Sequence, residues 1–91
     1  MMQFDSTKEI LEFLQEFSPD AQLADGYNDC LIGVAEQFAG IVAVYDRDKI
    51  IEALQEEMDE DEAEEWFSTN INGSFVGEMT PIYLAGLIKD V

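Results

Sequence analysis

The chain contains no histidine and only one cysteine, Cys30, among its 91 residues. Without histidine there is no Ser–His or Cys–His pair to activate a nucleophile, and no imidazole acid–base group. The same absences leave few ligands for zinc or other transition metals. A single cysteine cannot form an intrachain disulfide bond, which favours a reducing, cytoplasmic compartment. We therefore expect a protein that is not an enzyme and has neither a cofactor nor a specific metal site.

Positive charge is also scarce. The chain has 21 Asp and Glu residues but only four basic residues, which gives a formal net charge of −17. The four are Lys8, Arg47, Lys49 and Lys89. Lys and Arg supply most of the contacts to nucleic-acid phosphates and anionic lipids, so direct binding to DNA, RNA or a membrane is disfavoured. The expected partners are instead basic protein surfaces.

Long apolar segments are missing as well. The longest runs, residues 41–45 and 81–88, are far shorter than the ~20 residues of a membrane helix, and no signal peptide is recognisable at the N-terminus. Hydrophobic residues nevertheless make up 47% of the chain and aromatic residues 11%, enough for a core that a disordered acidic tail lacks. We expect residues 1–91 to form a single acidic globular domain.

The first helix is predicted from its ends. Ser6 and Glu9 match a capping box, and Ser18-Pro19 disfavours helical continuation. Between them, apolar residues recur at helical spacing: Ile10, Phe13, Leu14 and Phe17.

The remaining elements follow from two strand-like runs and two further helix starts. Residues 30–35 and 41–45 read as a β-hairpin joined by residues 36–40. Asp46 is expected to cap a second helix and Asp59 a third, which ends near Asn72-Gly73. A last strand is expected within residues 75–84. The residues expected to face the core from the two helices are Ile50, Ile51, Leu54, Met58, Ala63, Trp66, Phe67 and Ile71.

The resulting order is α-β-β-α-α-β. It predicts an α+β fold in which about three helices pack against a small, mainly antiparallel sheet of about three strands.

The densest feature of the sequence is an acidic run in residues 56–65. As a helix, ten residues would span about 15 Å, or about one negative charge per 2 Å, close to the ~1.7 Å of duplex DNA. Such a surface could occupy a protein site that binds phosphates; the alternative is a solvated helix face whose acids favour the helix dipole. The candidate partner-binding residues are Glu56, Glu57, Asp59, Glu60, Asp61, Glu62, Glu64 and Glu65.

Residues 73–81 form a second candidate. Two glycines around Phe75 and a Thr-Pro pair suggest a constrained loop that presents Phe75 or Met79 to a partner, unless Phe75 belongs to the core. A paired-carboxylate enzyme is a third class, which would need a deep cleft with convergent acids. Residues 59–62 lack the alternation and the glycine of an EF-hand loop, so no calcium site is expected.

The motifs in residues 25–33 (DGYNDCLIG), 44–46 (VYD) and 76–81 (VGEMTP) resemble those of short uncharacterised proteins of tailed bacteriophages and their bacterial hosts. This resemblance implies a phage or prophage setting and carries over no catalytic residues. In that setting, small acidic proteins are similar in role to inhibitors of restriction or CRISPR complexes. The leading hypothesis is a non-enzymatic inhibitor that mimics nucleic acid. The alternative is an adaptor or regulatory interaction module whose acidity serves solubility.

Overall fold

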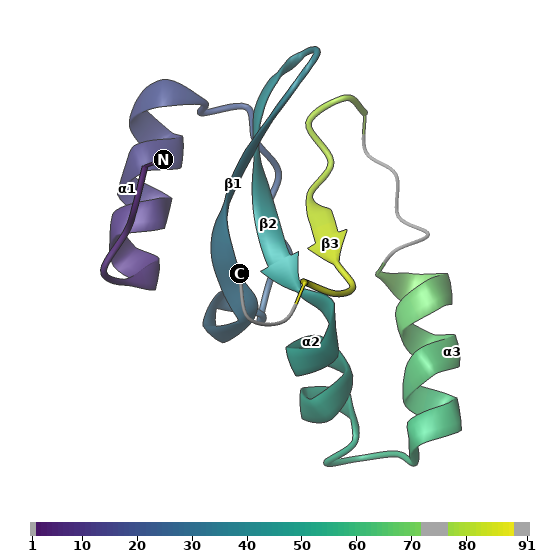
Figure 1. Cartoon of the computed structure of the whole chain (residues 1–91). Coiled ribbons are helices and arrows are strands. Elements are labelled where there is room, and N and C mark those ends of the chain that lie inside the picture. The colour runs from purple at the N-terminus through teal and green to yellow at the C-terminus, as the bar shows by residue number, and fades with distance from the viewer. Residues whose placement is uncertain (1, 72–76, 89–91) are drawn as a thin grey trace.

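The computed structural model describes residues 2–71 and 77–88. In these residues the chain forms α1 (Thr7–Phe17), a short 3₁₀ turn η1 (Asn28–Cys30), β1 (Leu31–Gln37), β2 (Gly40–Asp46), α2 (Arg47–Leu54), α3 (Glu60–Asn70) and β3 (Ile82–Leu84). The strands form one sheet in the order β1-β2-β3 (Figure 1). The predicted α+β class and the order α-β-β-α-α-β are confirmed.

The sheet is mixed. β1 pairs antiparallel with β2 from Leu31↔Tyr45 to Gln37↔Gly40, with an irregularity between Leu31 and Gly33. β3 pairs with β2 in parallel over its three residues. The connection makes parallel pairing possible, because the chain passes through α2 and α3 before it returns to the sheet, and parallel strands need such a crossover. The longer ladder is the antiparallel one, as predicted.

The hairpin turn is tighter than predicted. Glu36 and Gln37 continue β1, so that only Phe38 and Ala39 connect the two strands. Gly40, which starts β2, has a φ of +148°, a backbone conformation that side chains with a Cβ rarely adopt. The sequence predicts residues 36–40 as the connection because they separate two apolar runs and have a suitable length. In the structure, strand pairing extends past the first run and satisfies the backbone groups of Glu36 and Gln37.

All three α-helices begin at an acceptor side chain, as the sequence predicts. The amide nitrogens of Glu9, Lys49 and Glu62 donate to Ser6, Asp46 and Asp59 over 3.3, 3.2 and 2.8 Å, respectively. The reciprocal bond of the capping box is displaced by one residue. The Glu9 carboxylate accepts from the amide of Asp5, at 3.1 Å, instead of from that of Ser6.

A single core joins the helices to the sheet. Ile10 and Leu14 of α1 and Ile50 of α2 belong to the same buried cluster as Tyr45 of β2 and Phe67 of α3. Other members include Cys30, Leu31, Ala43, Ile51, Leu54 and Ala63. Cys30 is thus a small core residue, and burial is the main cause that raises the pKa of its thiol.

Aromatic and polar contacts fix the centre of this core. The Tyr83 ring stacks on Tyr45, with 5.8 Å between centroids, and meets Phe67 edge-on at 5.2 Å. The Tyr45 hydroxyl oxygen accepts from the Ala24 amide at 2.8 Å, and the buried Ser18 hydroxyl donates to the Ile41 carbonyl at 2.6 Å. These bonds satisfy polar groups whose burial would otherwise be costly.

Two aromatic residues do not face the core as predicted. Trp66 is 40% exposed and Phe17 is 62% exposed. Trp66 directly precedes Phe67, and neighbouring residues of a helix point about 100° apart, so burial of Phe67 turns Trp66 toward the edge of the core. Phe17 lies in the last turn of α1 and contacts the Phe13 ring, with 4.9 Å between centroids.

Candidate protein-interaction surface

The acidic run covers the end of a helical hairpin. Glu56, Glu57 and Asp59 lie in the connection between α2 and α3, and the other five acids lie in α3. In Figure 1 this connection lies at the lower end of the molecule, away from the sheet. Seven of the eight residues are exposed and Glu64 is half-buried. We call the seven the acidic lobe: Glu56, Glu57, Asp59, Glu60, Asp61, Glu62 and Glu65.

The lobe is not a straight row of charges. α2 ends at Leu54 and α3 begins at Glu60, so the run is not the single helical segment used to estimate the spacing of its charges. Met58, half-buried against the core, holds the connection close to the body of the domain. The carboxylates therefore lie on the connection and on the first half of α3, and they do not copy one duplex strand.

Part of this charge is favourable to the fold. Glu60, Asp61 and Glu62 occupy the first turn of α3, where negative side chains interact favourably with the helix dipole. Asp59 also caps the helix. A local structural role thus explains some of the acids at the start of α3. It does not explain Glu56, Glu57 and Glu65, which lie outside the cap and the first turn of this helix.

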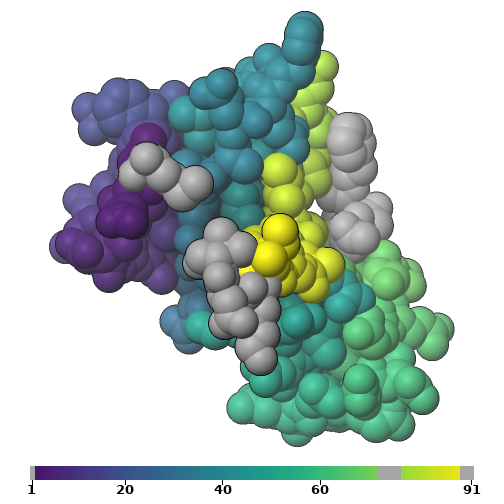
Figure 2. Space-filling view, in the orientation of Figure 1, coloured from purple at the N-terminus to yellow at the C-terminus, as the bar shows by residue number. Residues whose placement is uncertain are grey.

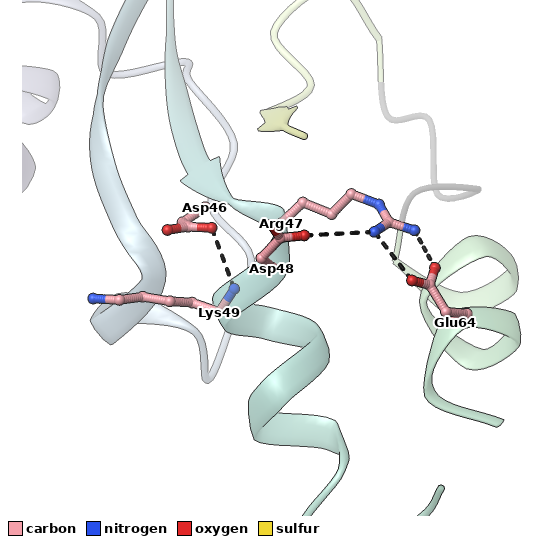
Figure 3. A network of polar contacts seen from close by, with 5 residues as sticks. All are labelled: Asp46, Arg47, Asp48, Lys49 and Glu64. Atoms are coloured by element: carbon pink, nitrogen blue, oxygen red, sulfur yellow. Dashed lines mark hydrogen bonds and ion pairs between the residues drawn. The ribbon is translucent and has the colours of Figure 1, made fainter. Parts of the chain in front are cut away.

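Glu64 differs from the other seven acids because it forms an ion pair with Arg47 at the surface of the domain. Both terminal nitrogens of the Arg47 guanidinium donate to its two carboxylate oxygens, one of them at 3.3 Å (Figure 3). The guanidinium also lies over the Phe67 ring, 5.0 Å from the centroid. Arg47 therefore links the start of α2 to α3, and the hydrogen bonds from Arg47 lower the pKa of the Glu64 carboxyl.

The ion pair predicts a pH-dependent difference between two variants. Glu64→Gln and exposed Glu65→Gln remove the same charge, but only the first breaks the pair with Arg47. Because the folded pKa of Glu64 is below its ordinary 4.5, the pair stabilises the protein above that pH and is lost as the pH falls through the folded value. We expect Glu64→Gln to be less stable than Glu65→Gln at about pH 7, and this difference to be smaller at about pH 3.

Urea unfolding of both variants at the two pH values measures this difference. A difference of the same size at both pH values would contradict the assignment, since a contact that does not titrate would then explain it. The sequence alone could not reveal this pair, because its two members are 17 positions apart and no local pattern links them.

The described part of the second candidate loop is held by the fold. The Thr80 hydroxyl donates to the Gly77 carbonyl at 2.6 Å, and the Met79 carbonyl accepts from the Gln22 amide at 3.1 Å. Met79 is half-buried, and its methyl carbon lies 3.4 Å from where a Cβ on Gly40 would be. Met79 therefore packs toward the hairpin. Phe75, Asn72 and Gly73 lie outside the described residues.

Other kinds of site are not indicated by the geometry. Within residues 2–71 and 77–88, no group of three or more His, Cys, Asp or Glu side chains is arranged to hold a metal ion. In the same ranges, no helix combines the length and apolar character that crossing a bilayer needs.

Comparisons of the chain with protein-family models, with curated proteins and with solved structures found no significant match. The functional argument therefore rests on the surface itself.

Proposed function

We propose that this protein is a non-enzymatic inhibitor of the phage type. In this proposal it occupies a basic nucleic-acid channel on a host defence complex, of the CRISPR or restriction kind, in the bacterial cytoplasm. The observation that carries the proposal is the acidic lobe: seven exposed acidic residues on the α2–α3 connection and the first half of α3. Arg47, at the start of α2, is already paired with Glu64.

The chemistry of such a contact is well defined. A channel that binds nucleic acid presents Arg and Lys side chains, and carboxylates form short, charge-assisted hydrogen bonds with both. A net charge of −17 on 91 residues also attracts a basic partner over several ångströms and increases the rate of association. A compact negative surface needs no duplex geometry to exclude DNA or RNA from a channel that it fills.

A second candidate function, a regulatory module with an apolar interface, is favoured by a different observation. Phe38, at the tip of the hairpin turn, is fully exposed, and the residues best suited to two-residue turns are Asn and Gly. Nothing in the turn requires an aromatic side chain. In this second function, the acidic residues would keep the protein soluble, and the contact with the partner would be apolar.

Capture from a bacterial lysate separates the two functions. The tagged protein is incubated with lysate near physiological ionic strength and then washed with increasing NaCl. We expect it to retain one nucleic-acid-binding complex that salt releases, because screening weakens contacts between exposed charges. A partner that stays bound in high salt and binds no nucleic acid would favour the apolar interface instead.

A further inference from the structure

A groove beside α3 is the second surface with the chemistry of a binding site. It has a volume of about 280 Å³ and lies between the segment before η1, the outer side of α3 and the start of β3. Its walls include Leu23, Asp25, Trp66 and Tyr83. Trp66, 40% exposed, and Leu23, 44% exposed, contribute apolar surface that the fold does not bury.

The aromatic walls are held in place before any ligand binds. Tyr83 is fixed by its stacking on Tyr45 and by the edge contact with Phe67. The backbone of Trp66 is fixed by α3, one residue before the buried Phe67. A rigid aromatic surface loses little conformational entropy on binding, which is why Trp and Tyr are frequent anchors of interfaces.

The groove is also negatively charged. Asp25 is exposed and contributes to one wall, and Glu62 of the acidic lobe lies one helical turn before Trp66. The negative charge of Asp25 also acts on the core. Burial is the main cause of the raised pKa of Tyr45, and the charge of Asp25 raises this pKa further. None of the described residues that line the groove is Lys or Arg.

From this combination we infer that the groove binds an arginine side chain of a basic protein segment. The guanidinium would lie against the Trp66 ring while Asp25 accepts its hydrogen bonds. A planar, weakly hydrated guanidinium stacks on an aromatic ring and pairs with a carboxylate at once, which a lysine ammonium does less well. A nucleobase could stack on Trp66 too, but its phosphates would be repelled by the lobe.

This inference deepens the proposed function, on which it rests. The lobe attracts a basic surface by charge, and the groove selects one arginine within it. Attraction by exposed charges mainly affects the rate of association, whereas a desolvated aromatic anchor mainly affects the rate of dissociation. The two parts of the surface can therefore be tested separately.

The test uses a fluorescein-labelled peptide, Gly-Leu-Arg-Leu-Gly, and two counterparts with lysine or citrulline in place of arginine. Binding to the full-length protein is followed by fluorescence anisotropy, and the emission of Trp66, the only tryptophan, reports contact. We expect the citrulline peptide to bind about tenfold more weakly than the arginine peptide, and the lysine peptide to fall between them. We also expect the arginine peptide to shift the Trp66 emission.

Variants then assign the binding to the groove. Trp66→Ala and Asp25→Asn should each weaken the arginine peptide by about five- to tenfold, and Trp66→Phe should keep part of the affinity. Phe17→Ala removes another exposed aromatic ring, on α1, and should leave binding unchanged. Asp25 is exposed, so its variant separates a loss of binding from a loss of folding, and circular dichroism checks the fold of each variant.

Equal affinity for the arginine and citrulline peptides, or unchanged binding by both Trp66→Ala and Asp25→Asn, would overturn the inference. So would quenching of Trp66 by a single-stranded oligonucleotide with no response to the arginine peptide. None of these results affects the capture experiment with lysate. If the captured complex is still released by salt while the peptide result is negative, only the groove assignment fails.

Discussion

Neutralising four acids of the lobe is expected to slow association with the captured complex by about tenfold to a hundredfold at low ionic strength. The variant carries E60Q, D61N, E62Q and E65Q and leaves the capping residue Asp59 and the paired Glu64 intact. The physical reason is loss of the local field that steers the encounter. The dependence of the association rate on salt should become flatter as well, because fewer charges remain to be screened.

The control removes the same charge from elsewhere on the surface. The control variant changes four exposed acids on or near α1 and at the end of β1: E12Q, E16Q, D20N and E36Q. In Figure 1, α1 lies to the left of the sheet and α3 to its right, and in the space-filling view the α2–α3 hairpin occupies the lower end of the molecule (Figure 2). Stopped-flow or surface-binding kinetics compare the two variants. If both slow association equally, net charge and not the lobe determines binding.

The second large effect concerns stability. Phe67→Ala should reduce the free energy of unfolding by about 3–5 kcal/mol, a large part of the ~5–15 kcal/mol that typical domains have. The Phe67 side chain is 1% exposed, contacts the Tyr83 ring and lies beneath the Arg47 guanidinium, so its loss leaves a cavity at the junction of α2, α3 and β3. Urea unfolding followed by circular dichroism measures the change.

Phe38→Ala is the matched control, because Phe38 is fully exposed at the hairpin turn. We expect its free energy of unfolding to stay within about 0.5 kcal/mol of the wild-type value. A small cost for Phe67→Ala, similar to that of the control, would show that the junction is not a packed part of the core.

The helix starts could be predicted from the sequence because their causes are local. Ser6, Asp46 and Asp59 each accept a hydrogen bond from an amide three residues later, and a short sequence window contains both partners. The β-branched run of residues 41–45 likewise indicated a buried strand, which β2 confirms. The length of the turn was less predictable, since Glu36 and Gln37 are polar and still pair with β2.

Features that depend on tertiary packing could not be predicted in the same way. The parallel direction of β3 depends on where α2 and α3 return the chain. The exposure of Trp66 depends on which of two neighbouring aromatic residues the core accommodates, and Phe67 is the one buried. The acids of the lobe were identified from composition, but the pairing of Glu64 with Arg47 and the groove beside Trp66 require the fold.

Competition at the captured complex tests nucleic-acid mimicry most directly. The complex is immobilised through this protein and washed with duplex DNA or RNA of the kind that the complex binds, at physiological ionic strength. We expect the nucleic acid to displace the complex, and the protein in turn to block nucleic-acid binding, because both occupy one basic surface. Simultaneous binding of the protein and the nucleic acid, with neither weakening the other, would contradict mimicry.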